Sequence, residues 1–384
     1  MHDKLKILTV IGTRPEAIKM AMVIKKLEEE PSIEHHLCIT GQHKEMLQQV
    51  IDFFELRIDF DLGIMEYGQS LTDITSKVIS SVAKFLDKIN PDIVLVHGDT
   101  NSCFATTLAA FYKKIPVGHI EAGLRTFDLT APFPEEANRL LTAKIATYHF
   151  APTKMNVQHL INEGIHPENI ILTGNTVIDS LLFVKSKVNS LSPFNNNIRI
   201  KEKLEKADKL ILVTGHRREN FGAGFEEICK ALQIIAKQQS TYTIVYPVHL
   251  NPSVRSTVNK YLSGIENIIL CDPLSYPDFV YLMNKSFLIL TDSGGIQEEG
   301  PSLGKPVIVM RDVTERPEAI EAGTVKLTGT DANAIVYAVN ELIDDPVVYE
   351  KMSKRINPYG DGHAAERIIS WLISNKELIK TEMA

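Results

Sequence analysis

The sequence lacks several patterns that would assign a protein to a class at once. Its four cysteines lie far apart and form no CxxC pair: Cys38, Cys103, Cys229 and Cys271. This spacing argues against a disulfide framework or a zinc site and favours a reducing cytoplasm. No apolar run approaches the ~18–20 residues that cross a bilayer, and the first residues lack the apolar segment of a signal peptide. We therefore expect a cytoplasmic protein with no membrane partner.

Positive charge and common cofactor motifs are also scarce. The net charge is −7 over 384 residues, and no lysine- or arginine-rich block occurs, so nucleic acid is not an expected partner. GxSxG, HExxH and Walker A runs are missing. The Gly-rich dinucleotide fingerprint is missing too, because Gly12-Thr13-Arg14 follows the first expected strand. No cluster of metal ligands is evident, so we expect no metal and no cofactor.

Apolar strand-like runs alternate with amphipathic helical runs along most of the chain. The first half has helical patterns at 15–29, 71–89 and 102–113 between strands expected at 5–11, 36–39, 93–97, 117–120 and 149–151. The pattern weakens over 185–208 and then restarts, with strands expected at 209–213, 243–246, 268–270, 287–290 and 307–310. Continuous apolar strands separated by helices indicate parallel sheets covered on both faces. The sequence thus predicts an α/β protein with two doubly wound, Rossmann-like domains that join near 175–205 and face a cleft.

A Ser-Gly-Gly turn within residues 291–299 is the most informative local run. It follows an apolar strand and opens a helix, so free backbone N–H groups and the helix dipole favour a phosphate at Ser293, Gly294 and Gly295. Glu298 and Glu299 lie one turn further on, where a carboxylate suits sugar hydroxyls better than phosphate. The run therefore indicates a nucleotide or nucleotide-sugar site, and an ordinary strand-to-helix turn is the alternative.

Other unusual residues also follow strands, where ligands bind in open α/β sheets. The cationic candidates are Arg14, Lys19, His216, Arg217, Arg218 and Arg316. Arginine binds phosphate with a planar fork and keeps its proton, although Arg217 and Arg218 could instead form a solvated surface pair. The acidic candidates are Asp99, Glu121, Asp128, Glu135 and Glu136. Acids gathered near a polyanion suggest proton transfer or hydrogen bonds to hydroxyls. Helix capping for Glu135 and Glu136 and an Asx-turn for Asp99 are the structural alternatives.

With these residues assembled, the chain resembles the bacterial non-hydrolysing UDP-N-acetylglucosamine 2-epimerases from about residue 5 to residue 370. The resemblance is carried in order by Gly12-Thr13-Arg14-Pro15-Glu16-Ala17-Ile18-Lys19, His97-Gly98-Asp99-Thr100, His119-Ile120-Glu121-Ala122-Gly123-Leu124-Arg125, Phe133-Pro134-Glu135-Glu136, Thr173-Gly174-Asn175-Thr176, His216-Arg217-Arg218-Glu219-Asn220, the Ser-Gly-Gly run, Thr314-Glu315-Arg316-Pro317-Glu318 and Asn357-Pro358-Tyr359-Gly360-Asp361-Gly362. Each piece is modest alone, but the ordered set is very specific.

The resemblance implies a GT-B-like homodimer that interconverts UDP-GlcNAc and UDP-ManNAc for cell-surface polysaccharide synthesis. It implies anti elimination of UDP to 2-acetamidoglucal, followed by re-addition of UDP. It also implies an N-terminal domain over 1–175, a UDP-binding domain over 176–363, and a C-terminal helix at about 364–384 that packs back on the first domain.

The same resemblance assigns roles to individual residues. It implies acid/base carboxylates at Asp99, Glu121 and Glu135 with Lys19 nearby, and leaves open which acts in which step. UDP would be held by Arg14, His216, Ser293, Gly294, Gly295, Glu299 and Arg316. Glu299 would take the ribose hydroxyls, the others mainly the diphosphate, and His216 would also assist phosphate departure.

Bacterial members often carry a second, activating UDP-GlcNAc site, and four residues fit its pattern: Gln42, His43, Arg217 and His249. Glu45 stands where glutamine is usual and Gly68 where arginine is usual. We expect this exchange of charge to weaken activation.

Three other functions remain open from the sequence. A GT-B glycosyltransferase would share the Ser-Gly-Gly cradle but would not need three acids around the sugar. A hydrolysing epimerase would release free ManNAc. A nucleotide-sugar sensor would bind UDP-GlcNAc without exchanging its C2 hydrogen.

Overall fold

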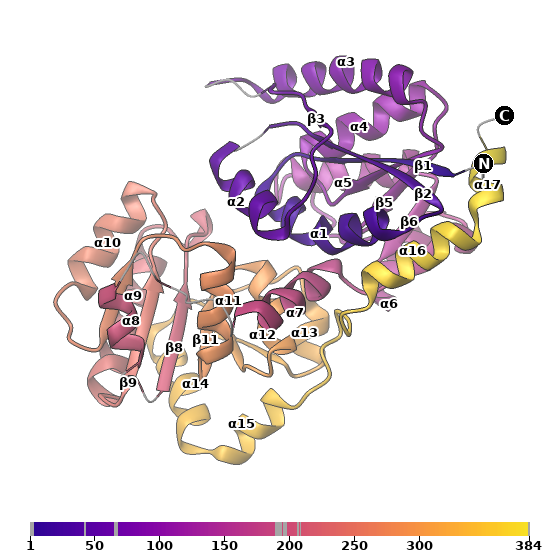
Figure 1. Ribbon diagram of the computed structural model, residues 1–384. Helices are drawn as coiled ribbons and strands as arrows, with labels where there is room; N and C mark the ends of the chain where they lie inside the picture. Colours follow the sequence, from indigo (N-terminus) through magenta and orange to yellow (C-terminus); the bar gives the residue numbers. More distant parts are fainter. Residues whose placement is uncertain are drawn as a thin grey trace. The chain divides into compact units, whose positions relative to one another are not determined.

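The chain folds into two compact α/β units (Figure 1). In the computed structural model, residues 4–41, 44–64, 68–188, 194, 198–205, 207 and 209–382 are described. Unit 1 comprises Met1–Ser180 and Tyr359–Ala384, and unit 2 comprises Leu181–Pro358. Among the described residues, no helix is both long and apolar enough to cross a membrane.

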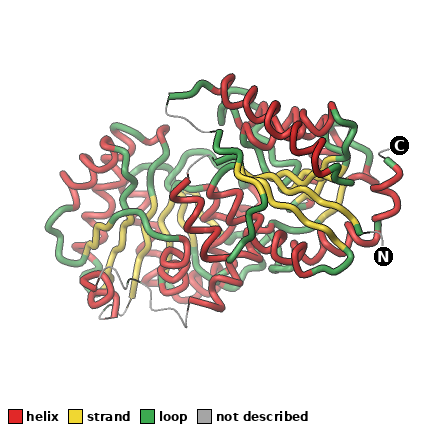
Figure 2. Tube along the Cα trace, turned by 45° about the horizontal axis from the view of Figure 1, so that its top comes forward, coloured by secondary structure: helices red, strands yellow, loops and turns green. Residues whose placement is uncertain are grey.

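Unit 1 is built on a parallel sheet that, in the described part of the chain, has seven strands in the order β3-β2-β1-β4-β5-β6-β7. The strands are β1 (Leu5–Ile11), β2 (Ile33–Ile39), β3 (Phe60–Asp61), β4 (Ile93–His97), β5 (Val117–Ile120), β6 (Tyr148–Ala151) and β7 (Ile170–Leu172). Between these strands lie the helices α1 (Arg14–Glu29), α2 (Lys44–Phe54), α3 (Leu71–Ile89), α4 (Asn101–Tyr112), α5 (Glu135–Ile145) and α6 (Lys154–Asn162). Figure 2 shows the strands enclosed by helices, which accounts for apolar residues on both sides of β1 and β4.

The strand order reverses between β1 and β4, and this position defines where a ligand can approach unit 1. Two helices begin directly after these strands. Thr13 caps α1 in a reciprocal capping box with Glu16, and the hydroxyl of Thr100 accepts the N–H of Cys103 at the start of α4. Both caps fix helix N-termini at the carboxyl edge of the sheet.

The C-terminal segment returns to unit 1. This segment contains the helices α16 (Ala364–Ser374) and α17 (Lys376–Thr381), and α16 packs on α1. The ring of Trp371 lies 4.6 Å from that of Tyr148 and 5.4 Å from that of Phe150. Asp179 accepts the N–H groups of Ala364 and Ala365 at 3.2 and 2.8 Å. The carboxylate thereby satisfies donors at the start of α16, which carry no intrahelical partner.

Unit 2 repeats the architecture with a parallel sheet in the order β10-β9-β8-β11-β12-β13, counted over its described residues. The strands are β8 (Lys209–Thr214), β9 (Tyr242–Pro247), β10 (Ile268–Cys271), β11 (Leu288–Thr291), β12 (Val307–Val309) and β13 (Val325–Leu327). The helices are α8 (Ile198–Glu205), α9 (Ala223–Gln238), α10 (Pro252–Leu262), α11 (Tyr276–Lys285), α12 (Gly294–Ser302), α13 (Pro317–Glu321), α14 (Ala332–Asp344) and α15 (Pro346–Ser353). The order reverses between β8 and β11, directly before the Ser-Gly-Gly turn.

The two-domain α/β prediction is confirmed, whereas three short strands were not expected. Strands β3, β7 and β13, each of two or three residues, were not predicted. Helix α7 (Thr176–Val188) ends within the weakly patterned stretch 185–208, and α8 lies inside it. The boundary between the units falls inside α7.

Buried histidines make the stability of unit 1 sensitive to acid. Burial lowers the pKa of His35, His97 and His149 from 6.5 to about 4, and that of His119 to about 3. The unfolded chain binds protons below pH 6.5 while these folded rings stay neutral, so their contribution is lost as the pH falls from 6.5 towards 4. Burial of Glu16 raises its pKa from 4.5 to about 7, which acts in the opposite direction over the same range. Burial also raises the pKa of Glu28 and Asp179, which act in the same direction as Glu16. Because the four histidine shifts outweigh these carboxyl shifts, we expect a net loss.

We predict that the Tm of unit 1 falls by ~5–10 °C between pH 7 and pH 4.5. His149→Gln should make this fall shallower, because one buried titrating ring is removed while a donor is kept for the carbonyl of Ala146. The exposed His166 provides the matched control, and His166→Gln should leave the slope unchanged. Calorimetry over this pH range checks the prediction, and equal slopes for wild type and His149→Gln would contradict it.

Candidate active site

The carboxyl ends of β1, β4 and β5 gather most of the residues predicted in the first half of the chain. Lys19 lies in the second turn of α1, Asp99 follows β4, and Glu121 follows β5. The N–H of Gly98 donates to the carbonyl of Ile120 at 2.9 Å, which places the chain after β4 against the end of β5. The structure therefore brings Lys19, Asp99 and Glu121 to one edge of the sheet.

Glu121 is the most constrained of these residues. Its backbone has φ of 65°, in the left-handed region that residues other than glycine rarely adopt. Its carboxylate, 10% exposed, forms an ion pair with Lys19 and accepts the amide of Asn175 at 3.2 Å. Strained backbone persists where the surroundings hold it, and such residues concentrate at functional sites.

Asp99 is held by helix α5. Its carboxylate is 25% exposed and forms an ion pair with Arg139, while Asn138 donates to its backbone carbonyl at 3.0 Å. The guanidinium of Arg139 also binds Glu136 at 2.8 Å. The Asp99 side chain is thus engaged by a cation from a neighbouring helix.

Glu135 and Glu136 differ despite standing side by side at the start of α5. Glu136 is buried and accepts the N–H groups of Thr126 and Phe127 at 3.1 and 3.0 Å as well as Arg139. Glu135 is partly exposed, and its carboxylate has no hydrogen bond or ion pair with any described residue. Glu136 therefore holds the loop before α5, whereas Glu135 is available for chemistry.

Arg14 is the first residue of α1 and lies beside Glu16, whose carboxyl group is fully engaged. Glu16 accepts the N–H groups of Gly12 and Thr13 at 3.0 and 2.7 Å and the hydroxyl of Thr100 at 2.8 Å. Arg14 is partly exposed and begins its helix at the carboxyl end of β1. This places a guanidinium at the same edge as Lys19.

His97 belongs to this site but was missed as an individual residue. It is buried, with Nε2 3.8 Å from the Glu121 carboxylate, and neither ring nitrogen has a hydrogen-bond partner among the described residues. Its position at the end of β4, directly before Gly98 and Asp99, was the available signal.

In unit 2, the Ser-Gly-Gly turn and Arg316 lie against each other. Ser293 occupies the N-cap position of α12 without a capping hydrogen bond from its side chain, and a Cβ added at Gly294 would lie 2.9 Å from Cζ of Arg316. Arg316 is buried and donates to Glu298 at 2.8 Å, and its guanidinium lies 2.9 Å from Glu315. A guanidinium beside the N-terminus of α12 places two kinds of anion-binding group together.

Acidic residues fix this guanidinium. Burial alone would raise the pKa of Glu315, but the charges of Arg316 and Arg311 outweigh it and lower the pKa to about 2. Glu298 pairs with the same guanidinium, that of Arg316. The neighbouring Glu299 has a different partner, because its carboxylate accepts the hydroxyl of Tyr276 at 2.8 Å. Gly295 follows Gly294 in the first turn of α12.

Asp292 holds the segment that contains His216 and Arg217, and it was not among the residues expected from sequence. One oxygen of this buried carboxylate accepts the N–H groups of His216 and Arg217 at 2.8 Å each. The other lies 3.7 Å from Nδ1 of His216, whose ring stacks on that of His249 with centroids 5.3 Å apart. Partial burial lowers the pKa of His216, although Asp292 opposes this effect. A buried aspartate at the end of β11 was the signal.

The residues predicted for a second site are only partly described. The described part of the chain does not include Gln42 and His43, nor the side chains of Glu45 and Arg218. Arg217 lies 3.5 Å from Glu315, and His249 stacks on His216, so both adjoin the residues of unit 2 discussed above. Gly68 has φ of 79°, where a side chain would be strained.

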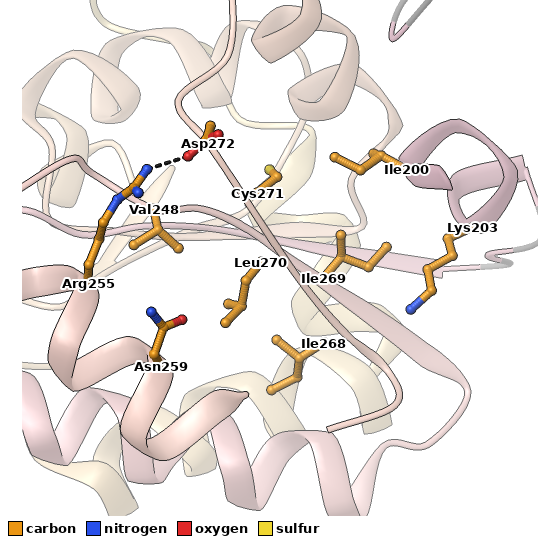
Figure 3. A pocket seen from close by; sticks show the side chains of 10 residues that line it. All are labelled: Ile200, Lys203, Val248, Arg255, Asn259, Ile268, Ile269, Leu270, Cys271 and Asp272. Carbon is orange, nitrogen blue, oxygen red and sulfur yellow. Dashed lines mark hydrogen bonds and ion pairs between the residues drawn. The ribbon is translucent and has the colours of Figure 1, made fainter. Parts of the chain in front are cut away.

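Unit 2 also contains a cavity of about 540 Å³ (Figure 3). Its lining includes none of the candidate site residues of unit 1 or unit 2 described above. It lies beside the edge strand β10, and Arg255 and Asp272 form an ion pair at its side. Its lining is Ile200, Lys203, Val248, Arg255, Asn259, Ile268, Ile269, Leu270, Cys271 and Asp272.

Comparison with known proteins agrees with this arrangement. The family model for UDP-N-acetylglucosamine 2-epimerase matches residues 25–373. The enzyme of that name from Escherichia coli strain K12 is 54% identical over 373 residues, which cover 97% of this chain and 99% of that protein. The crystal structure of UDP-GlcNAc 2-epimerase from Neisseria meningitidis bound to UDP-GlcNAc matches with a TM-score of 0.88 and 51% identity, covering 96% of this chain and all of that one. The Methanocaldococcus jannaschii enzyme in complex with UDP-GlcNAc and UDP matches with a TM-score of 0.80 and 32% identity, covering 96% and 99% of the two chains.

Two parallel-sheet α/β units, each with polar residues at the carboxyl ends of its strands, define a GT-B-like enzyme. Within that class, the chain belongs to the UDP-N-acetylglucosamine 2-epimerase family.

The contact between Gly294 and Arg316 leads to a prediction. Gly294→Ala should displace the guanidinium, and if this guanidinium holds the diphosphate of UDP, UDP binding should weaken by ~10–150-fold, since a charge-assisted hydrogen bond contributes ~1.5–3 kcal/mol. A Cβ at Gly295 would meet its nearest atom at 3.7 Å, an ordinary contact, so Gly295→Ala should cost less. Titration calorimetry with UDP measures both variants, and equal losses would argue against displacement of Arg316.

Proposed function

We propose that the enzyme interconverts UDP-GlcNAc and UDP-ManNAc by anti elimination of UDP to 2-acetamidoglucal, followed by return of a proton to C2 on the opposite face and re-addition of UDP at C1. The observation that carries this proposal is the group of Lys19, Asp99 and Glu121 at one sheet edge, in a chain that belongs to the epimerase family. A carboxylate held beside an ammonium group can take up and return a proton if its partners adjust.

The chemistry explains why both acids and cations are needed. The C2 hydrogen is not adjacent to a carbonyl, so its direct removal would be very difficult. Breaking the C1–O bond builds positive charge at C1 and makes the C2 hydrogen more acidic. The enzyme must then stabilise the departing diphosphate and supply a base and an acid.

We assign the departing UDP to residues of unit 2 and to Arg14. The N-terminus of α12 (Ser293, Gly294, Gly295) and Arg316 would neutralise the diphosphate. His216, steadied by Asp292, would donate to a phosphate oxygen as the C1–O bond breaks. Glu299, which already accepts a hydroxyl from Tyr276, would take the ribose hydroxyls.

Asp99, Glu121 and Glu135 would act on the sugar, with Lys19 holding Glu121 in place. Their environments differ, because Glu121 pairs with Lys19 and Asp99 pairs with Arg139, whereas Glu135 has no cationic partner among the described residues. Acids in different environments can take different roles, one removing the C2 proton while another returns a proton. No metal ligand set occurs among the described residues.

Proton NMR of UDP-GlcNAc in deuterated water tests the proposal. The enzyme alone should convert part of the substrate to UDP-ManNAc and introduce deuterium at C2. Free ManNAc would instead indicate a hydrolysing epimerase. No conversion without an acceptor would favour a glycosyltransferase, and binding without exchange at C2 would favour a sensor.

We further propose that the enzyme acts as a cytoplasmic homodimer that supplies ManNAc units for surface polysaccharides. The resemblance to bacterial epimerases supports all three points, and free thiols at all four cysteines are compatible with a reducing compartment. Light scattering of the purified protein measures the mass, and a monomer would contradict the dimer.

We also propose that activation by UDP-GlcNAc at a second site is weak. Glu45 adds an anion and Gly68 lacks the usual cation, a change that would cost a diphosphate ~1–3 kcal/mol of binding. Turnover of UDP-ManNAc should then respond little to added UDP-GlcNAc. A sigmoidal response of normal potency would contradict this proposal.

A further inference from the structure

Arg139 of helix α5 connects two acids that come from different segments of unit 1. Its side chain is only 6% exposed. One guanidinium nitrogen binds Asp99, which follows β4, and another binds Glu136 in the first turn of α5. A planar guanidinium can bridge two carboxylates because its N–H groups point in fixed directions, whereas the compact ammonium group of lysine lacks this fork.

The two ends of this bridge are not equivalent. Glu136 is buried and also accepts the N–H groups of Thr126 and Phe127, so three groups donate to it. The only cation that pairs with Asp99 among the described residues is Arg139. Loss of Arg139 would therefore leave Glu136 with two donors but would leave the Asp99 side chain unrestrained.

Helix α5 also fixes the backbone of Asp99. Asn138, the neighbour of Arg139, donates its amide to the carbonyl of Asp99 at 3.0 Å and to the side chain of Asn101 at 2.9 Å. Glu135 lies four residues before Arg139, on the same face of the helix. One helix thus carries Glu135 and holds both the backbone and the carboxylate of Asp99.

We propose that Arg139 is a positioning residue for epimerisation, which fixes the Asp99 carboxylate relative to Glu135 on α5. Arg139 binds Asp99 through Oδ2, so Oδ1 is left for a ligand on a side chain that is 25% exposed. The inference rests on the proposed function, because it concerns the geometry of the same acid/base groups. Arg139 itself touches no reacting atom.

The test compares Arg139→Ala and Arg139→Lys with wild type. Arg139→Ala should lower kcat by ~10²-fold, the usual cost of misplacing a catalytic group by about 1 Å. The KM for UDP-GlcNAc and the Kd for UDP should change less than ~3-fold, because the proposed UDP contacts involve other residues. Arg139→Lys should recover part of kcat, because one ammonium group can bind Asp99 without bridging to Glu136.

Chemical rescue separates positioning from a merely structural role. Guanidinium ions, far below denaturing concentrations, should raise kcat of Arg139→Ala at least ~10-fold, while ethylammonium ions at equal ionic strength should not. Arg125→Met is the matched control, because Arg125 is a buried arginine paired with Glu163 at 2.6 Å in the same unit. That variant should lose thermal stability yet keep the kcat of its folded fraction and show no rescue.

The outcomes separate failure of this inference from failure of the proposed function. If wild type does not form UDP-ManNAc, the proposed function fails whatever Arg139 does. If wild type is active, retention of kcat in Arg139→Ala overturns the inference, and so does a loss of kcat without guanidinium rescue. Should Arg139→Ala not fold, Arg139→Lys decides, and full wild-type kcat in that variant overturns the requirement for a fork.

Discussion

Glu121→Gln is expected to lower kcat for epimerisation by ~10²–10⁴-fold, the range that a positioned acid or base contributes. Glutamine is nearly isosteric with glutamate, but its amide neither accepts nor returns a proton at neutral pH. It also carries no charge to pair with Lys19, whose ammonium group forms a hydrogen-bonded ion pair with the Glu121 carboxylate. UDP affinity should be largely retained, because the proposed UDP contacts do not include Glu121.

The measurement is the rate at which UDP-ManNAc and C2 deuterium form from UDP-GlcNAc, together with the Kd for UDP. Glu341→Gln provides the control, because Glu341 also pairs with a lysine, Lys326, at 2.6 Å in unit 2. That variant should keep wild-type kcat. A wild-type rate for Glu121→Gln would show that the catalytic assignment of Glu121 is wrong.

The strands that position the site could be predicted because they are buried on both faces. β1, β4 and β5 have the bounds expected from sequence, since apolar residues dominate β1 and β4 and a polar turn directly follows each of the three strands. Strands β3 and β7 are the two edge strands of their sheet, counted over its described residues, and have only two or three residues. Their pairing depends on neighbours that are distant in sequence, which local patterns do not encode.

The site shows a similar division between residue type and tertiary partner. The sequence predicts that acids and cations meet at strand ends, because parallel strands share one carboxyl edge. Residue type and spacing alone allow both Glu135 and Glu136 to cap α5, and only the family resemblance singles out Glu135. Their different environments arise from Arg139 and from the N–H groups of the preceding loop. Asp292 was missed for the same reason, since its role depends on backbone N–H groups that follow β8.

Arg316→Met is expected to weaken UDP binding by ~10²–10³-fold. Arg316 lies beside Gly294 and pairs with both Glu298 and Glu315, so its loss removes a cation and leaves acids next to the N-terminus of α12. The lost UDP affinity comes from removal of charge-assisted hydrogen bonds to the diphosphate. Truncating one member of a buried charge pair also costs ~2–5 kcal/mol of folding stability, largely because the remaining charge stays buried without its partner. Arg311 still neutralises Glu315 at 2.7 Å, so the unpaired charge should fall mainly on Glu298.

Titration calorimetry with UDP and thermal unfolding together test this prediction. In the double variant Arg316→Met, Glu298→Gln the unpaired carboxylate is gone, so stability should recover more than UDP affinity does. Arg255→Met is the matched control, because Arg255 also pairs with an acid in unit 2 but lies at the cavity beside β10. It should bind UDP as wild type does. If Arg316→Met binds UDP with wild-type affinity, the diphosphate is held elsewhere, and the guanidinium serves only to compensate Glu298 and Glu315.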